Sequence, residues 1–372
     1  MTVSTSGSLW DLDTPALLVD VDRMNANLAR MARRCVETGV RLRPHTKTHK
    51  TPEIARLQRE HGASGISVAK VGEAEVMAAA GFDDLFVVYP VLGEEKYRRL
   101  LAVMERADAR IGLDSYEVAS AASQFFHAHG RRLKVLLEID SGFGRCGMQS
   151  LEEAEAMADR IGDLPGVELV GVLGFGGHAY KATDLEGRAA VGRQEGLQAV
   201  EVAEALRRRG HTGVRDVSVG SSPSAPHAAG VTGVTEVRPG VYVFNDRKQV
   251  SIGAARLEDC ALTVLATVVS RPRPDRVIID AGIKAFAGED YGWGSYGQLL
   301  DQPGTILSWA AEEHGVIQVG PTNPDPGLRI GDKVRIIPNH GCGTTNMHDV
   351  VYAVQGETVR DTWRVAGRGK FR

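Results

Sequence analysis

The segment Val40-Arg41-Leu42-Arg43-Pro44-His45-Thr46-Lys47-Thr48-His49-Lys50 places a lysine between two histidines, directly after a short β-like run. Barrel enzymes of the α/β class carry their chemistry at the carboxyl ends of the strands. A lysine held there beside other cations can have a lowered pKa, so that its neutral amine attacks an aldehyde. Lys47 is therefore a candidate Schiff-base nucleophile, and His45 is a candidate cofactor contact. A basic surface loop or a phosphate patch explains this segment alone equally well.

Outward from this segment, short apolar runs alternate with amphipathic helices over the first two-thirds of the chain. We predict strands at Ala16–Val19, Gly65–Val68, Leu85–Tyr89, Arg110–Leu113, Leu133–Ile139, Val167–Leu173 and Val217–Val219. Further helices are predicted at Gly72–Ala80, Glu117–His129 and Gln194–Arg209. Asp22 is expected to cap an earlier helix, which Gly39 ends. Because alternation of this kind predicts a parallel sheet, about eight such units indicate a closed (β/α)8 barrel whose first strand begins near Ala16. A doubly wound sheet is the alternative.

The pattern changes after about Asp246. Segments 262–269, 276–280, 333–338 and 350–354 are strand-like, and little helix separates them. We therefore expect an α/β barrel domain over residues 12–248. A mostly β C-terminal domain would follow, made of residues 249–372 together with residues 1–11.

The composition is that of an ordinary globular protein, with 372 residues, of which 43% are hydrophobic and 24% charged. A net charge of -3 gives no indication of a nucleic-acid partner. No apolar run approaches the length that crosses a bilayer, and residues 1–10 lack the features of a signal peptide. We therefore expect a cytoplasmic protein. Its four cysteines have no paired spacing, which argues against a disulfide framework.

Two glycine-rich turns lie near the end of the predicted barrel. Gly220, Ser221 and Ser222 follow one strand, and Gly240 and Tyr242 lie in the second turn. Such turns leave backbone N–H groups free and add hydroxyl donors, which together can cradle a phosphate dianion. Ordinary turn chemistry explains either turn alone, but two of them on successive late strands favour a phosphate site. The dinucleotide and P-loop fingerprints are absent from both turns.

Two further polar side chains leave predicted strands. Arg145 lies between glycines and is placed to hydrogen-bond the phenolic oxygen of a cofactor, or a carboxylate. The alternative for Arg145 is a salt bridge with Glu138 or Asp140. His178 follows the next strand and is a candidate base or a support for a cofactor ring, although a lone loop histidine is more often merely solvated.

A candidate metal pair lies in the late segment Pro338-Asn339-His340-Gly341-Cys342-Gly343-Thr344-Thr345-Asn346. His340 and Cys342 are two residues apart in what we expect to be an extended, glycine-rich stretch, so both can reach one ion. Imidazole and thiolate together suit zinc or another borderline metal. Because two ligands are too few for a closed structural site, water and substrate would complete the coordination, as a catalytic metal requires.

Together these motifs resemble the D-threonine aldolase and D-serine dehydratase family of pyridoxal phosphate (PLP) enzymes, over nearly the full length of the chain. The resemblance implies an alanine-racemase-like fold and a homodimer with shared active sites. It implies that Lys47 binds the cofactor covalently and that Arg145 lies near its phenolic oxygen. The family's phosphate-binding segments fall on Gly220, Ser221, Gly240 and Tyr242, and its metal pair falls on His340 and Cys342.

The subgroups of this family differ in the reaction that they catalyse. This chain resembles the D-threonine aldolases in Gly144-Arg145-Cys146-Gly147 and in Gly177-His178. Those aldolases often carry aspartate as the second metal ligand, whereas Cys342 resembles the D-serine and hydroxyaspartate dehydratase branch. The chain therefore departs from each subgroup somewhere.

We expect a PLP- and divalent-metal-dependent lyase that cleaves a D-β-hydroxy-α-amino acid into glycine and an aldehyde. Dehydration of a D-serine or D-threo-3-hydroxyaspartate type of substrate is the alternative. Racemisation ranks third, because it gives the metal no purpose, and a non-catalytic PLP carrier on the same barrel ranks after it. Thiolate ligation favours zinc, with manganese, magnesium and cobalt left open. Arg238 is a further candidate, for contact with the pyridine nitrogen.

Overall fold

Eight parallel strands form one sheet, in the order β2-β9-β8-β7-β6-β5-β4-β3, in the computed structural model of the chain. A parallel bridge between His45 and Ser67 joins the two ends of this order and closes the sheet into a barrel. The strands are β2 (Arg41–Leu42), β3 (Ile66–Val68), β4 (Asp84–Val87), β5 (Asp108–Leu113), β6 (Leu133–Ile139), β7 (Val167–Gly174), β8 (Asp216–Val219) and β9 (Glu236–Val237). The predicted (β/α)8 barrel is thereby confirmed.

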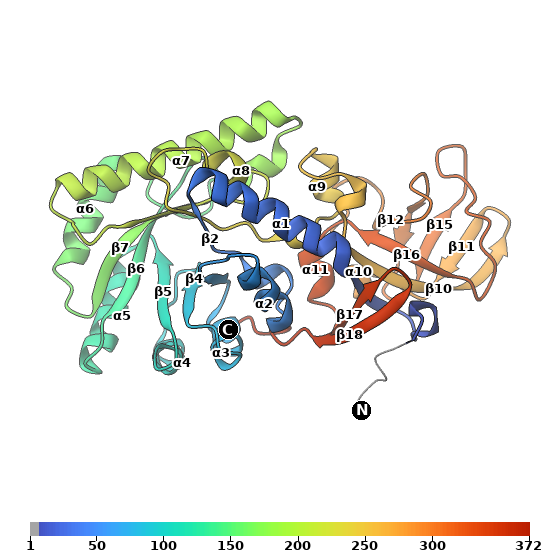
Figure 1. Ribbon diagram of the computed structural model, residues 1–372, viewed down its shortest axis with the longest axis horizontal. Coiled ribbons are helices and arrows are strands. Elements are labelled where there is room, and N and C mark those ends of the chain that lie inside the picture. Colours follow the sequence, from blue (N-terminus) through green and yellow to red (C-terminus); the bar gives the residue numbers. More distant parts are fainter. Residues whose placement is uncertain (1–6) are drawn as a thin grey trace. The chain divides into compact units, whose positions relative to one another are not determined.

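A helix follows each of the first seven strands of the barrel, and Figure 1 shows α3 to α6 outside strands β4 to β7. The helices are α1 (Val21–Thr38), α2 (Pro52–Glu60), α3 (Val71–Ala79), α4 (Glu94–Met104), α5 (Tyr116–Ala128), α6 (Leu151–Gly162), α7 (Leu185–Arg208) and α8 (Ala225–Ala228). Helix α1 ends at Thr38, and the next residue, Gly39, has a positive φ of 68°. Its start is held by Asp20 rather than by Asp22, because Asp20 Oδ1 accepts a hydrogen bond from the backbone N–H of Arg23.

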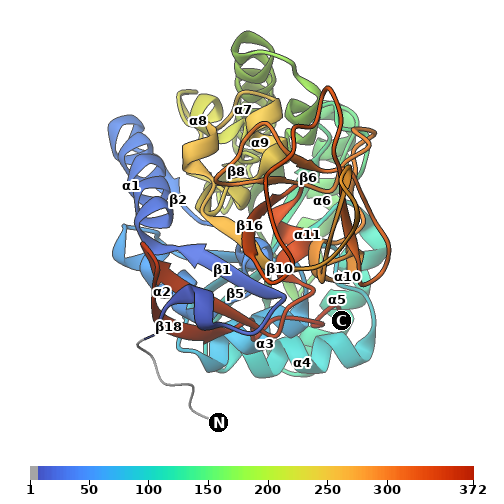
Figure 2. The ribbon, with the colours of Figure 1, turned by 90° about the vertical axis from the view of Figure 1, so that its right-hand side faces the viewer.

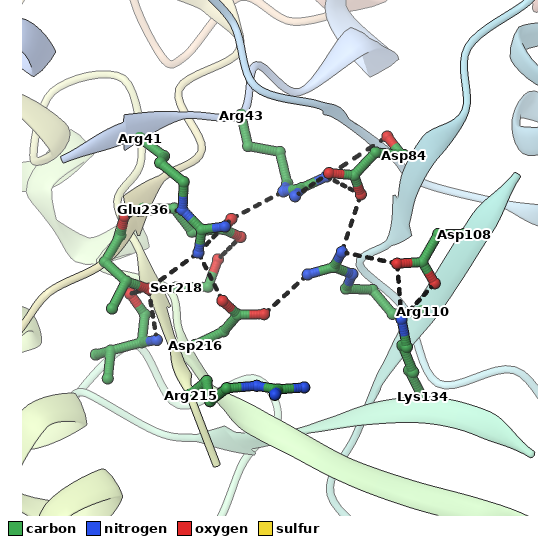
Figure 3. Close-up of polar contacts among 12 residues, drawn as sticks. Arg41, Arg43, Asp84, Asp108, Arg110, Lys134, Arg215, Asp216, Ser218 and Glu236 are labelled. Carbon is green, nitrogen blue, oxygen red and sulfur yellow. Dashed lines mark hydrogen bonds and ion pairs between the residues drawn. The ribbon is translucent and has the colours of Figure 1, made fainter. Parts of the chain in front are cut away.

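A network of ion pairs links the strands of the barrel near their amino ends (Figure 3). Arg43 is fully buried and donates to Glu236 Oε2 over 2.9 Å and to both carboxylate oxygens of Asp84 over 2.8 Å. Arg110 joins Asp84 to Asp216 at 3.0 and 2.8 Å. These charges compensate one another at the amino ends of the strands. Barrel enzymes place their chemistry at the other end, where the strands have their carboxyl ends.

The second sheet is mostly antiparallel and has ten strands. They are β1 (Ala16–Asp20), β10 (Leu262–Arg273), β11 (Arg276–Ile279), β12 (Gly297–Leu299), β13 (Ile306–Leu307), β14 (Trp309–Ala310), β15 (Gly315–Gln318), β16 (Lys333–Pro338), β17 (Val350–Gln355) and β18 (Thr358–Arg364). Short helices α9 (Arg247–Ser251), α10 (Ile283–Phe286) and α11 (Gly341–Thr345) accompany them. This confirms the predicted mostly β region.

The prediction that Ala16–Val19 is the first barrel strand is wrong. Strand β1 pairs antiparallel with β10 and parallel with β17, and Figure 2 shows it, in blue, beside β10. Its residues 16–19 are all buried, so its apolar pattern is the same as that of a barrel strand. The first strand of the barrel is instead β2, which has only two residues.

The structure describes residues 7–372, and these divide into two units. The barrel unit consists of residues 29–47, 54–240 and 369–372. The β unit consists of residues 7–28, 48–53 and 241–368. The expected β-rich domain starts at residue 1, and its first six residues lie outside the described part. Within residues 7–372, none of the helices is long and apolar enough to span a lipid bilayer.

Candidate active site

Lys47 follows strand β2 in the short 3-10 helix η2 (Thr46–Thr48), at the carboxyl edge of the barrel. His45 is the residue that closes the barrel through its bridge to Ser67, and its ring Nδ1 lies 3.4 Å from the backbone N of Lys47. The Lys47 amine lies 5.8 Å from the centre of the Phe175 ring, which follows strand β7. Lys47 is therefore at the edge that the sequence predicted, beside an aromatic ring that it did not predict.

The two glycine-rich turns meet at the same edge. Gly220 follows β8 with a φ of 96°, and a Cβ there would lie 3.0 Å from Ala225 Cβ, so the tight turn requires glycine. The hydroxyl of Ser222 accepts a hydrogen bond from the backbone N–H of Gly240 over 3.1 Å. Tyr242 is buried in η4 (Val241–Val243) and belongs to the β unit.

Glu195, on helix α7, holds the first of these turns. Its Oε1 accepts from Gly220 N over 2.6 Å, and its Oε2 accepts from the Ser224 hydroxyl over 2.9 Å. The Ser224 hydroxyl in turn accepts from the backbone N–H of Ser221 over 2.8 Å. Burial raises the pKa of the Glu195 carboxyl, and its hydrogen bonds with Gly220, Gly176 and Ser224 oppose that effect.

Glu195 is not among the site residues predicted from the sequence, although the sequence contains a signal for it. Residues Gly192, Glu195, Gly196 and Ala199 share the buried face of α7, so Glu195 is a carboxylate on an apolar stripe. A charge in that position must be compensated inside the protein.

Arg145 lies in the loop after β6 and contacts both Glu138 and two aromatic rings. Its Nη2 is 3.5 Å from Glu138 Oε1, and its guanidinium lies 4.5 Å from the centre of the Phe175 ring. The salt bridge with Glu138 therefore forms, whereas Asp140 accepts from the backbone N–H groups of residues 142–144. Arg145 remains 46% exposed, so its guanidinium also faces solvent or a bound molecule.

Three buried polar atoms at the carboxyl edge lack a hydrogen-bond partner among the described residues. They are His178 Nδ1 after β7, Ser67 Oγ in β3 and Ser141 Oγ after β6. Buried polar atoms are rarely left unpaired, so an unpaired set at one edge indicates a polar ligand or water there. Together with the serine and glycine turns, these atoms fit a phosphorylated cofactor such as PLP.

His340 and Cys342 lie in the β unit, where strand β16 ends and α11 begins. The prediction that both ligands lie in an extended segment is wrong for Cys342, which lies inside α11. Of the two, only His340 has an extended backbone, with φ -139° and ψ 107°. The Thr48 hydroxyl lies 3.2 Å from Cys342 Sγ. Burial lowers the pKa of His340, but the opposing effects of Cys342, Glu289 and Asp246 are larger and raise it to about 11.

The donor set of this pair fits a divalent cation. Imidazole and thiolate are ligands for zinc and similar metals. Within the described residues, no group of three or more His, Cys, Asp or Glu side chains is placed to hold an ion. The pair would therefore leave positions open for water or substrate.

Comparisons with known proteins cover almost the whole chain. Residues 19–248 match the family model of the alanine racemase N-terminal domain, and residues 261–354 match a model described as "Putative serine dehydratase domain". A D-threo-3-hydroxyaspartate dehydratase of Delftia sp. is 37% identical over 96% of this chain and 98% of that protein. A D-threonine aldolase of Arthrobacter sp. is 36% identical over 96% of this chain and 93% of that protein.

Solved structures agree with these relatives. A D-threonine aldolase from Filomicrobium marinum is 30% identical, with a TM-score of 0.92 over 100% of both chains. A D-threo-3-hydroxyaspartate dehydratase in which a cysteine is replaced by alanine, in the metal-free form, is 35% identical. It has a TM-score of 0.88 over 96% of this chain and 98% of that chain. The chain therefore belongs to the D-threonine aldolase and D-serine dehydratase family of alanine-racemase-like enzymes.

Proposed function

We propose that this protein is a PLP- and divalent-metal-dependent lyase that cleaves the Cα–Cβ bond of D-β-hydroxy-α-amino acids. The observation that carries the proposal is the convergence of five segments on one edge of the barrel. Lys47, Arg145, His178, Gly220 and Gly240 follow strands β2, β6, β7, β8 and β9 respectively. Chemistry at the carboxyl edge of such a barrel is the general rule.

The chain's own residues divide into groups that would hold the cofactor and groups that would move protons. Lys47 would bind the cofactor aldehyde through its amine. Arg145 would donate to the phenolic oxygen, and His45 would border the ring. The phosphate would be held by Gly220, Ser221, Ser222, Gly240 and Tyr242. In this arrangement PLP supplies the sink for the electrons released at Cα.

The metal pair gives the reaction its requirement for a β-hydroxyl group. An ion on His340 and Cys342 would act as a Lewis acid toward that hydroxyl. His178 is our candidate for the base that accepts the hydroxyl proton, because its unpaired Nδ1 lies at the carboxyl edge. Loss of that proton is what allows the Cα–Cβ bond to break, with release of an aldehyde and glycine.

Dehydration is the second candidate, and Cys342 is the observation that favours it. A dehydratase relative whose cysteine is replaced by alanine has been solved in a metal-free form, which connects a cysteine with metal in that protein. In a dehydratase the Lys47 amine would instead remove the Cα proton, and the β-hydroxyl would leave. The products would then be a keto acid and ammonia.

The remaining parts of the proposal follow the family. We propose zinc as the ion, a homodimer with shared active sites, and a cytoplasmic location. We also propose that the expected barrel domain, residues 12–248 without the strand β1 that pairs with β10 and β17, acts as the cofactor domain, and that residues 249–372 with residues 1–11 act as the metal domain.

Consumption of D-threonine against L-threonine tests the proposed function. The purified protein with PLP and zinc should consume D-threonine, and prior treatment with a chelator should reduce the rate until metal is restored. The L-enantiomer serves as the matched control and should remain intact. Equal consumption of both enantiomers, or full activity after complete removal of metal, would contradict the proposal.

A further inference from the structure

The carboxylate of Glu289 faces the candidate metal ligand His340. Its Oε1 lies 3.2 Å from His340 Nδ1. A carboxylate opposite Nδ1 favours the tautomer in which that nitrogen carries the proton. The lone pair of the imidazole is then on Nε2. Metal-binding histidines commonly donate their second ring N–H to a carboxylate or carbonyl in this way.

The backbone of His340 is fixed independently of its ring. The N–H of the next residue, Gly341, donates to Asp246 Oδ2 over 2.9 Å at the start of α11. Asp246 is itself buried and also accepts from the backbone N–H of Gln249 over 2.9 Å. Since these contacts hold the main chain, the rotation of the imidazole ring is the degree of freedom that Glu289 can control.

Glu289 lies on a loop that is held against the same segment. Asn339 Nδ2 donates to the backbone carbonyl of Glu289 over 2.9 Å and to that of Ser295 over 2.6 Å. Ala287 and Tyr291, on either side of Glu289, have positive φ values of 65° and 53°. Side chains rarely adopt such backbone conformations without support from their surroundings. The loop conformation is therefore imposed, and it presents Glu289 to His340.

Space for the Glu289 carboxylate depends on Gly343, the residue after Cys342 in α11. A Cβ on Gly343 would lie 2.9 and 3.0 Å from the two carboxylate oxygens of Glu289, and 3.0 Å from Ala287 Cβ. The second oxygen, Glu289 Oε2, is buried without a hydrogen-bond partner among the described residues. The hydrogen bond with His340 and one with its own backbone N–H therefore hold the carboxylate group, and both effects lower the pKa of Glu289.

We propose that Glu289 is a positioning residue for the metal centre, which fixes the tautomer and ring orientation of His340 so that Nε2 faces the ion. The role rests on the proposed metal pair, His340 and Cys342. It is distinct from ligation, because Glu289 does not form a three-ligand group with that pair in the described residues. Removing such a carboxylate typically weakens metal binding 10- to 100-fold.

The test is the zinc affinity of the PLP-loaded protein, measured by competition with a chromophoric chelator. Glu289→Ala should raise the dissociation constant about 10- to 100-fold. Glu289→Gln should fall between Glu289→Ala and the wild type, since its amide oxygen still accepts the Nδ1 proton but carries no charge. The visible absorbance of bound cofactor and the melting temperature should match those of the wild type in both variants.

Gly343→Ala provides a second and independent variant. Its Cβ should displace the Glu289 carboxylate and weaken zinc binding in the same direction. In a Glu289→Ala background, where no carboxylate remains to be displaced, the same glycine change should have little further effect. Independent losses that add in the double variant would show that Gly343 acts by another route and would contradict the spatial argument.

His340→Ala and Cys342→Ala separate this inference from the proposed function. If both bind zinc as the wild type does, the metal pair is wrong and the role of Glu289 is overturned with it. If they lose zinc while Glu289→Ala keeps wild-type affinity, only the positioning role is overturned. Cobalt substitution adds a spectroscopic readout. At saturation, the ligand-field bands of Glu289→Ala should match those of the wild type, and a changed coordination spectrum would show that Glu289 is a ligand.

Discussion

At the scale of single residues, Lys47 decides whether the carboxyl edge of the barrel is a covalent cofactor site. The structure places its amine near the Phe175 ring, and Arg145 lies against the same ring. Both cations therefore gather on one aromatic side chain. This arrangement keeps the amine close to the strand ends rather than in open solvent.

Replacement of Lys47 should abolish both cofactor absorbance and turnover. Lys47→Arg is the sharper variant, because guanidinium keeps the charge and length but stays protonated and cannot attack an aldehyde. Lys47→Ala should behave in the same way. The visible spectrum and the rate with D-threonine are the measurements, and retained turnover in either variant would rule out Lys47 as the cofactor-binding amine.

Glu195 should affect the affinity of the protein for PLP more than the turnover rate of the PLP-bound enzyme. Glu195→Leu removes the acceptors for Gly220 N–H and Ser224, and buried donors left unpaired cost about 1–3 kcal/mol each. We expect the PLP dissociation constant to rise about 10-fold or more, with a smaller change in kcat at saturating PLP. Glu195→Gln, which keeps one acceptor, should be milder. An unchanged PLP affinity in Glu195→Leu would contradict this role.

At the scale of elements, the barrel unit should be sensitive to the loss of one partner of the buried ion pairs near the amino ends of its strands, because the remaining charges are then poorly compensated. Arg43→Met removes the buried cation that joins Glu236 to Asp84, and leaves these carboxylates only their ion pairs with Arg41 and Arg110. Breaking a buried pair from one side costs about 3–5 kcal/mol. The exposed pair of Arg98 with Glu94 offers a control, and Arg98→Met should cost about 0–1 kcal/mol. Equal stability of the two variants in denaturant unfolding would contradict the expectation.

The same network predicts how stability depends on pH. Burial would raise the pKa of Glu236, but Arg43 and Ser218 outweigh it and lower the pKa from its ordinary value of 4.5 to about 2. A carboxyl with a lowered pKa in the folded state contributes stability above its unfolded pKa, and that contribution is lost as pH falls from about 4.5 toward 2.

Glu236→Gln isolates this contribution. Its free energy of unfolding should be lower than that of the wild type at neutral pH, and should fall less steeply below about pH 4.5. The measurement is urea unfolding at several pH values. Parallel slopes for the variant and the wild type would assign the acid sensitivity to other carboxylates.

The elements also show where the sequence was sufficient and where it was not. Continuous apolar runs bounded by glycines predicted most barrel strands within a few residues. Such runs arise because both faces of a barrel strand are buried. The same property misassigned β1, whose four buried residues match a barrel strand but pair with β10 and β17. Pairing partners are set by long-range contacts that no local pattern contains.

The candidate site shows the same division. Lys47, Arg145 and His178 were found because each follows a predicted strand, and strand ends share an edge. Glu289 lies in the loop between α10 and β12, outside any helix or strand. No periodic pattern of apolar residues therefore marks it. The helix around Cys342 was missed because it has only five residues, two of them glycine.

At the scale of the whole molecule, we expect a dimer. The family resemblance implies active sites shared between two subunits, so sedimentation should give twice the 40.0 kDa of one chain. Activity should fall on dilution into the range where the dimer dissociates. A fully active monomer would contradict the shared site without affecting the barrel assignments.

The central claim is that this enzyme breaks the Cα–Cβ bond of its substrate. Product analysis after incubation with D-threonine, PLP and zinc tests it most directly. We predict glycine and acetaldehyde in equal amounts, with loss of both products after chelation of the metal. Formation of 2-oxobutyrate and ammonia without glycine would contradict the claim and identify a dehydratase.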